Sequence, residues 1–162
     1  MILIALGSNL SSHAGNPAAT LHAALTYLSR NGVTIVEVSH FYRTPAWPDP
    51  RDPEFVNAVA RVETELSPAA LIARLHETET TFGRMRSERN APRTLDLDIL
   101  DYEGRVEEGP PVLPHPRIAS RAFVLIPMQD VAPDWCHPVS GMPMSELLSA
   151  IPEKDRNAVI RI

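Results

Sequence analysis

The chain has 162 residues, of which 44% are hydrophobic and 22% are charged, values typical of one soluble globular domain. Its 15 basic and 20 acidic residues give a net charge of −5, which argues against a general nucleic-acid-binding protein. Cys136 is the only cysteine, so an internal disulfide and a cysteine-rich zinc site are excluded. No apolar run approaches the roughly 20 residues of a membrane span, and the N-terminus lacks the basic segment of a signal peptide. We therefore expect a cytoplasmic protein.

The first half of the chain carries clear signals for strands and helices. The apolar run at residues 1–6 predicts a short strand buried on both faces. Asn16-Pro17 and Ser67-Pro68 each place a capping side chain before a proline suited to the first helical position, so each is expected to begin a helix. Between the two helices, residues 55–65 alternate with period two, which is typical of a strand.

The complete set of expected elements defines a fold class. In chain order they are strands at 1–6, 33–43, 55–65 and 94–102, two main helices that begin at 17 and 68 and end near Gly32 and Gly83, and shorter helices at 123–128 and 143–151. The core order β-α-β-β-α-β is that of a ferredoxin-like α+β sandwich, an antiparallel sheet with flanking helices. Nothing marks a domain boundary, so we expect one domain over residues 1–162.

Arginine is unusually frequent and unevenly placed. Lys154 is the single lysine among the 15 basic residues, and four of the arginines lie within ten residues: Arg84, Arg86, Arg89 and Arg93. A guanidinium presents a planar fork of donors that suits phosphate or carboxylate. No lysine lies near a glycine-rich turn, which excludes a Walker-type phosphate loop. The cluster is either a phosphate-binding loop or a solvated surface loop; GC-rich coding explains a general bias but not the clustering.

The segment after the arginines predicts a metal site. On a strand, Asp96 and Asp98 point to one face, while Leu95, Leu97 and Ile99 point to the other. The two aspartates then lie about 6.6–6.8 Å apart at their Cα atoms. Two converging carboxylates repel each other, and hard oxygen ligands suit Mg²⁺. An isolated pair of this kind is more often a solvated strand face, but the arginines upstream favour a metal-bound polyphosphate.

A second group of residues is suited to a flat heterocycle. Phe55 and Asn57 share one strand face next to the loop Thr44-Pro45-Ala46-Trp47, and Phe123 is available from a distant segment. Aromatic faces with an amide between them can stack a planar ring and bind its edge. Each phenylalanine taken alone is more often an ordinary core residue.

Five segments together resemble a known enzyme family, 6-hydroxymethyl-7,8-dihydropterin pyrophosphokinase. They are Gly7-Ser8-Asn9-Leu10, Phe41-Tyr42-Arg43-Thr44-Pro45, Phe55-x-Asn57, Pro92-Arg93-Thr94-Leu95-Asp96-Leu97-Asp98, and Pro114-His115 with Arg121-x-Phe123. The resemblance covers essentially the whole chain, and the fourth segment is the most specific of the five. It implies an enzyme that transfers pyrophosphate from ATP to a pterin alcohol and releases AMP.

The resemblance also implies roles for individual residues. Asp96 and Asp98 would hold two Mg²⁺ ions, with Asp96 also near the pterin hydroxymethyl group. The residues expected to take part in catalysis are Arg84, Arg86, Arg89, Arg93, Asp96 and Asp98. Those expected to bind ATP are His76, Glu79, Arg84, Arg93, Ile99, His115 and Arg121. Those expected to bind the pterin are Thr44, Pro45, Trp47, Phe55, Asn57, Asp96 and Phe123.

The expected partners are therefore small molecules, ATP and 6-hydroxymethyl-7,8-dihydropterin, with no nucleic acid, no membrane and a monomeric chain. Two other functions remain open from the residues. One is a ferredoxin-like regulatory module that binds nucleotides or pterins without turnover, and the other is a metal-dependent nuclease that uses the same aspartates. A binding module would release no AMP, and a nuclease would act on single strands without a pterin.

Overall fold

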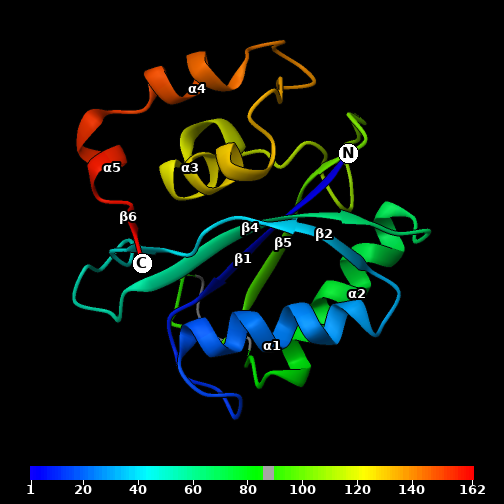
Figure 1. The fold of residues 1–162 in the computed structure, drawn as a ribbon, viewed down its shortest axis with the longest axis vertical. Helices are drawn as coiled ribbons and strands as arrows, with labels where there is room; N and C mark the ends of the chain where they lie inside the picture. The colour runs from blue at the N-terminus through cyan, green and yellow to red at the C-terminus, as the bar shows by residue number, and fades with distance from the viewer. Residues whose placement is uncertain (86–89) are drawn as a thin grey trace.

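An antiparallel sheet with helices on both faces organises the fold (Figure 1), seen in a computed structural model that describes residues 1–85 and 90–162. The strands are β1 (Ile2–Ser8), β2 (Thr34–Val38), β3 (Tyr42–Thr44), β4 (Phe55–Glu63), β5 (Asp96–Tyr102) and β6 (Ile160–Arg161). Their order is β5-β1-β4-β3-β6, and β2 pairs with β4 beside β3. Because β1 lies between the last and the third core strand, this is the ferredoxin-like order, and the α+β prediction is confirmed.

Two helical layers cover the sheet (Figure 1). One layer holds α1 (Pro17–Ser29) and α2 (Pro68–Thr81), and the other holds α3 (Ala122–Val131), α4 (Met144–Ala150) and α5 (Glu153–Asn157), with a short 3-10 turn at Ile118–Ser120 before α3. The two long helices begin at their predicted caps. Oδ1 of Asn16 accepts a hydrogen bond from the Ala19 amide at 2.9 Å, and Oγ of Ser67 accepts one from the Ala70 amide at 3.2 Å.

Each face of the sheet packs into a separate core. On β1, Ile4 faces α1 and α2, while Leu3 faces α3, and both side chains are fully buried. This two-sided burial explains why residues 1–6 form a continuous apolar run rather than an alternating one. On β4 the alternation is as expected, with Ala58 in the first core and Val59 in the second.

The strand expected at 33–43 is two strands, β2 and β3. They pair with different ends of β4, residues 60–63 and 55–57. Ser39 lies at the break: its amide donates to the Val59 carbonyl at 2.9 Å, and its hydroxyl accepts from the Val59 amide at 3.0 Å. A side chain thus replaces a backbone partner, which ends the regular ladder.

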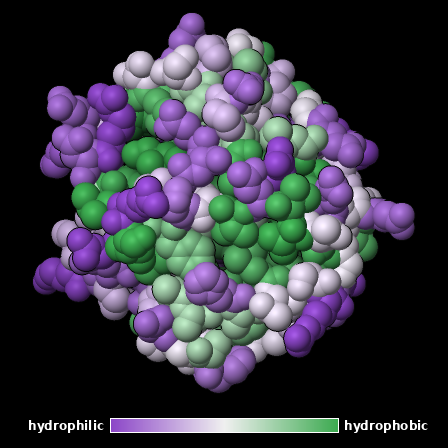
Figure 2. Space-filling view, viewed as in Figure 1, coloured by the Kyte–Doolittle hydropathy of each residue, from purple (hydrophilic) through white to green (hydrophobic). Residues whose placement is uncertain are grey.

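The C-terminal third contains more structure than the sequence predicted. Helix α3 continues to Val131 rather than ending at Met128, because Val131 packs in the second core with the rest of the helix. Helix α5 and strand β6 were not expected. Hydrophobic residues gather across the middle of the face seen in Figure 2. The large hydrophobic side chains exposed in the described part of the chain include Val36 of β2 and Ile160 of β6. Within the described residues, no helix combines the length and apolarity needed to cross a membrane.

Candidate active site

The floor of the candidate site is the face of β1, β4 and β5 that points toward α3. Beyond Leu3, which is buried against α3, β1 carries only the small residues Ala5 and Gly7 on this face. Gly7 pairs with Asn57 on β4 and with Asp96 on β5, and Ala5 pairs with Asp98. Longer side chains therefore rise on both sides of a low central strand, which leaves a groove.

The groove widens into a hollow that opens to solvent. Gly7 keeps its floor low: a Cβ atom there would lie 3.0 Å from Oδ1 of Asn57 and 4.0 Å from Cβ of Asp96. Residues from β1, β4, β5, α3 and the segment before α3 line the hollow; they are Ala5, Leu6, Gly7, Asn57, Ala58, Asp96, Asp98, Leu100, His115, Arg121, Phe123 and Val124. The hollow thus contains residues expected at the metal, the nucleotide and the pterin.

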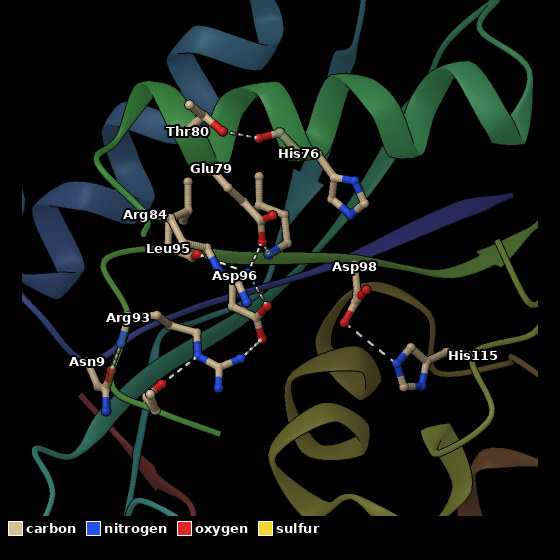
Figure 3. A network of polar contacts seen from close by, with 12 residues as sticks. Asn9, His76, Glu79, Thr80, Arg84, Arg93, Leu95, Asp96, Asp98 and His115 are labelled. Atoms are coloured by element: carbon tan, nitrogen blue, oxygen red, sulfur yellow. Dashed lines mark hydrogen bonds and ion pairs between the residues drawn. The ribbon is translucent and has the colours of Figure 1, made fainter. Parts of the chain in front are cut away.

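The two aspartates project from the same face of β5, as the alternation predicted (Figure 3). Their surroundings differ. Oδ1 of Asp96 accepts a hydrogen bond from Nη1 of Arg84 at 2.9 Å, and its Oδ2 lies 3.5 Å from Nη1 of Arg93. Oδ2 of Asp98 lies 3.6 Å from Nε2 of His115, and the Asp98 side chain is 41% exposed. Asp96 is therefore held between two guanidinium groups, while Asp98 is open to an additional ligand.

Glu79 holds the first of these arginines from behind. It projects from α2, is 2% exposed, and accepts from Nη1 of Arg84 and, at 2.9 Å, from the backbone amide of Leu97. Burial alone lowers the pKa of the Arg84 guanidinium, but the carboxylates of Glu79 and Asp96 outweigh it and raise that pKa above its ordinary value. Arg84 therefore stays charged although it is largely buried.

A third guanidinium group, that of Arg121, approaches from the start of α3. The guanidinium carbon of Arg121 lies 5.4 Å from the centre of the Phe123 ring. Burial lowers the pKa of Arg121, and nearby Arg117 lowers it further, against the opposing charges of Asp98 and Asp96. Keeping Arg121 protonated costs free energy, because the side chain is partly buried and Arg117 has the same charge. An anionic ligand at this end of the hollow would offset that cost.

His115 is held by backbone groups on both sides. Its amide donates to the Leu100 carbonyl at 2.9 Å, which fastens the segment to β5. The Arg117 amide donates to Nδ1 of His115 at 3.1 Å. Because Nδ1 accepts, the proton of the neutral ring is placed on Nε2, the atom that faces Asp98.

The residues expected at the heterocycle lie on the β4 side of the groove. Nδ2 of Asn57 donates to Oγ1 of Thr44 at 2.8 Å, and both side chains are buried. The ring of Phe55 lies 3.8 Å from a Cβ atom placed on Gly7. Phe123 is 36% exposed at the hollow. Asn57 and Phe123 therefore line the hollow, while Phe55 lies beside Gly7 without being one of its lining residues.

Not every expected residue reaches the hollow. The side chain of Ile99 is 2% exposed in the core beneath α1 and α2, on the opposite face of the sheet. Trp47 is 68% exposed and Pro45 is exposed, and neither lines the hollow. His76 is exposed and does not line the hollow; Figure 3 shows its ring extending from α2 above β5. Arg86 and Arg89 lie outside the described residues.

Two residues of the site escaped prediction as individual contributors. The sequence analysis includes Gly7 and Asn9 in the segment Gly7-Ser8-Asn9-Leu10 but predicts no individual role for either residue. The role of Gly7 depends on which residues pair beside it. The role of Asn9 depends on segments 44 and 84 residues away along the chain. Neither relation has a local sequence signal.

The donor set fits Mg²⁺ that is shared with a substrate. Asp96 and Asp98 offer hard oxygen atoms at the edge of an open hollow. Among the side chains of residues 1–85 and 90–162, no group of three or more His, Cys, Asp or Glu is arranged to hold a metal ion by itself. Mg²⁺ characteristically takes one or two carboxylates and completes its shell with water and phosphate oxygens, so two aspartates suffice.

The fold and the site together define a class: a ferredoxin-like α+β protein in which a carboxylate pair and Arg121 line one open hollow, with Arg84 and Arg93 beside Asp96, as suits a metal-bound polyphosphate. Residues 3–133 match the family model described as 7,8-dihydro-6-hydroxymethylpterin-pyrophosphokinase (HPPK). The chain belongs to this family, which confirms the resemblance and the prediction of a pyrophosphokinase enzyme. The ATP-dependent chemistry of such kinases generally uses Mg²⁺.

Individual relatives agree with the family model. The chain is 41% identical over 150 residues to 2-amino-4-hydroxy-6-hydroxymethyldihydropteridine pyrophosphokinase of Methylorubrum extorquens, covering 91% of both chains. It is 41% identical over 139 residues to the protein of that name from Haemophilus influenzae, covering 85% of this chain and 84% of the relative. A crystal structure of Plasmodium falciparum HPPK-DHPS shares the fold with a TM-score of 0.70 at 14% identity, over 91% of this chain and 40% of that longer one.

Proposed function

We propose that the chain transfers a pyrophosphoryl group from ATP to the hydroxymethyl oxygen of 6-hydroxymethyl-7,8-dihydropterin, a step of folate biosynthesis that releases AMP. One observation supports this most directly: the lining of a single hollow combines Asp96, Asp98 and Arg121 with Asn57 and Phe123. The first set suits a polyphosphate and the second a flat heterocycle. The family and the names of the relatives point to the same reaction. The regulatory alternative is not favoured, because the relatives are named as enzymes.

In this reaction the hydroxymethyl oxygen bonds to the β-phosphorus, the bond from that phosphorus to the oxygen bridging toward the α-phosphorus breaks, and the hydroxyl proton is released. The chain therefore has to align two substrates and stabilise charge, and needs no covalent nucleophile. Asp96 shares a cross-strand row with Gly7 and Asn57, so it lies nearest to the place for the pterin. Arg84, Arg93 and Arg121 are the proposed phosphate ligands: the first two contact Asp96, and the third lines the hollow.

Two Mg²⁺ ions are part of the proposal, with Asp96 and Asp98 as their protein ligands; when bound, they would neutralise phosphate oxygens and orient the polyphosphate. The chain's own groups prepare that position. His115 orients toward Asp98, and Arg84 and Arg93 hold Asp96 on the side of the groove. From the resemblance, Arg86 and Arg89 are proposed as further phosphate ligands, and His76, Glu79 and the backbone near Ile99 as nucleotide contacts.

The assay that tests this function measures AMP release from ATP with Mg²⁺ and 6-hydroxymethyl-7,8-dihydropterin. We expect release only when all three are present. Asp98→Asn keeps the shape of the side chain and removes a charge, so it should lower the rate by about 100-fold or more with an unchanged circular dichroism spectrum. The exposed Asp134, which lies after α3, provides the matched control Asp134→Asn, with an expected rate near that of the wild type.

Two outcomes would contradict the proposal. Pterin binding without AMP release would indicate a binding module, and an Asp98→Asn variant with normal turnover at low Mg²⁺ would overturn the metal assignment. We also propose a cytoplasmic monomer of one domain. Sedimentation of the purified chain at one mass across concentrations would agree with the monomer, and a mass that rises with concentration would not.

A further inference from the structure

Asn9 is a buried polar residue at the end of β1, between the two halves of the site. It is 4% exposed, and its side-chain amide is bonded in two directions. Oδ1 accepts a hydrogen bond from the Arg93 amide at 2.7 Å, and Nδ2 donates to the Pro53 carbonyl at 3.1 Å. Figure 3 shows Asn9 beside the backbone that leads into Arg93. One short side chain thus connects two segments that are far apart in the sequence.

The contact with Arg93 holds its whole peptide unit. While Oδ1 of Asn9 accepts from the Arg93 amide, the Arg93 carbonyl accepts from the amides of Asn9 and Leu10, each at 3.1 Å. The Arg93 guanidinium is held in turn, since Nε donates to the Ala91 carbonyl at 3.1 Å and Nη1 lies 3.5 Å from Oδ2 of Asp96. Hydrogen bonds from Asn9 and Leu10 therefore fix the backbone of Arg93, which lies three residues before Asp96.

The contact with Pro53 reaches the other half of the site. Pro53 lies two residues before Phe55, where β4 begins, and it closes the proline-rich loop that follows Thr44. Phe55 lies next to Gly7 and to Asn57, the residues across the groove from Asp96. A displacement of the Pro53 carbonyl would move the start of β4 and with it the Phe55 ring.

We propose that Asn9 is a positioning residue that holds Arg93 and the start of β4 at one spacing, and so aligns the phosphate-binding and pterin-binding halves of the hollow. The proposal rests on the proposed function for the identity of the two ligands. Both amide atoms are used, and each serves a different half. The two halves can therefore be separated by substitution at a single position.

The separating pair is Asn9→Asp and Asn9→Ala. Aspartate keeps an acceptor for the Arg93 amide but cannot donate to Pro53, so the pterin KM should rise about fivefold while the ATP KM stays within about twofold. Alanine removes both bonds, so both KM values should rise and kcat should fall by about tenfold. Rates are taken per folded molecule at a temperature well below the unfolding transition of each variant.

Asn31→Ala is the matched control. Nδ2 of Asn31 donates to the Tyr27 carbonyl at 2.7 Å in the turn after α1, away from the hollow. It should lower the unfolding temperature and leave both KM values unchanged, because a purely structural amide affects the folded fraction only. If Asn9→Asp shifts both KM values alike or neither, or if Asn9→Ala leaves the ATP KM unchanged, Asn9 is not a positioning residue.

Direct binding separates this proposal from the proposed function. Calorimetric titrations of ATP with Mg²⁺, and of the pterin alone, are made on the wild type and the three variants. Suppose that the wild type releases no AMP, while Asn9→Asp still raises the dissociation constant for the pterin and leaves that for ATP unchanged. In that case the proposed reaction is overturned and the positioning role of Asn9 is supported. If the wild type is active and Asn9→Asp affects the two substrates equally in both kinetics and binding, the positioning role is overturned and the proposed reaction is retained.

Discussion

Gly7 shows how a residue without a side chain shapes the site. It is flanked by Asn57 on one strand and by Asp96 on the other. Its backbone does not require glycine, because it is not among the residues with positive φ. The requirement is one of space: Oδ1 of Asn57 would lie 3.0 Å from a Cβ atom on Gly7. The Asn57 amide cannot turn away freely, because Nδ2 is bonded to Thr44.

We expect Gly7→Ala to weaken pterin binding selectively. The new methyl group would push on the Asn57 amide and fill part of the groove floor, so the pterin KM should rise about tenfold while the ATP KM changes by less than about twofold. Steady-state kinetics with each substrate varied in turn measures both values. Gly104→Ala serves as the control, since a Cβ there meets nothing within 4 Å and its φ of +70° makes its effect one of stability only. Equal effects on the two substrates would show that Gly7 does not shape the pterin half.

At the scale of residues, the sequence predicted what lies within one element and missed what depends on two. Asp96 and Asp98 share a face because a strand alternates with period two, a property visible in the sequence itself. Asn9 acts through Pro53 and Arg93, and Gly7 acts through strand register, so neither role can be read from neighbouring residues. The burial of Ile99 follows from the same alternation, whereas its nucleotide role came only from the resemblance.

At the scale of elements, the contact between α2 and β5 determines how the aspartate strand is held. Strand β5 is at the edge of the sheet, so the outward amide of Leu97 has no neighbouring strand. Glu79 from α2 fills this place and also binds Arg84. A buried carboxylate thus replaces a strand partner and orients the cation that holds Asp96.

Glu79→Gln should destabilise the fold more than a surface change on the same helix. Glutamine can still accept from Leu97, but Arg84 loses the carboxylate of Glu79, one of its two anionic partners within residues 1–85 and 90–162, while staying largely buried, which should cost about 1–3 kcal/mol of unfolding free energy. Glu77→Gln is the comparison: Glu77 is 58% exposed, contacts Arg74, and should change stability by less than about 0.5 kcal/mol. Urea titrations give both values. Equal losses in the two variants would mean that burial of Glu79 has no special effect.

The predicted element boundaries failed where tertiary contacts replace local signals. The 33–43 segment has strand propensity throughout, but the hydroxyl of Ser39 pairs with Val59 and interrupts the ladder. Helix α5 is short, charged and without buried residues, so it carries no hydrophobic period to detect. The β-α-β-β-α-β core was predictable because each of its elements has a local signal: proline caps begin the two helices, and the strands show a continuous apolar run, an alternating pattern or high strand propensity.

At the scale of the whole molecule, the hollow lies where the α3 layer meets the sheet, so its shape depends on how that layer is held. Asp130 near the end of α3 contacts β3 and the turn before it. Its Oδ2 accepts from the Tyr42 hydroxyl at 2.8 Å and from the His40 amide at 3.1 Å. Tyr42 lies two residues before Thr44, and Asp130 lies seven residues, about two helical turns, after Phe123. One carboxylate therefore joins the two layers that carry the pterin half of the site.

This layer contact should make stability depend on alkaline pH. Burial, followed by the hydrogen bond and negative charge of Asp130, raises the pKa of Tyr42 from 10.0 to about 12, against an opposing effect of Arg161. Below pH 10 the hydroxyl is protonated in the folded and unfolded chains. Between about pH 10 and 12 the unfolded chain loses this proton while the folded chain keeps it, so the stabilisation falls as pH rises, by less than about 1.4 kcal/mol per pH unit.

Tyr42→Phe isolates this dependence, because all other titrating groups remain in both proteins. The difference in unfolding free energy between wild type and Tyr42→Phe should be constant below pH 10 and shrink steadily above it. Asp130→Asn provides a second arm: without the negative charge, the titration of Tyr42 seen in tyrosinate absorbance should move toward lower pH. A difference that stays constant through pH 12 would show that the layers are not held through a protonated Tyr42.

Because Asp130 and Phe123 share one helix, Tyr42→Phe should also raise the pterin KM at neutral pH while the ATP KM stays unchanged.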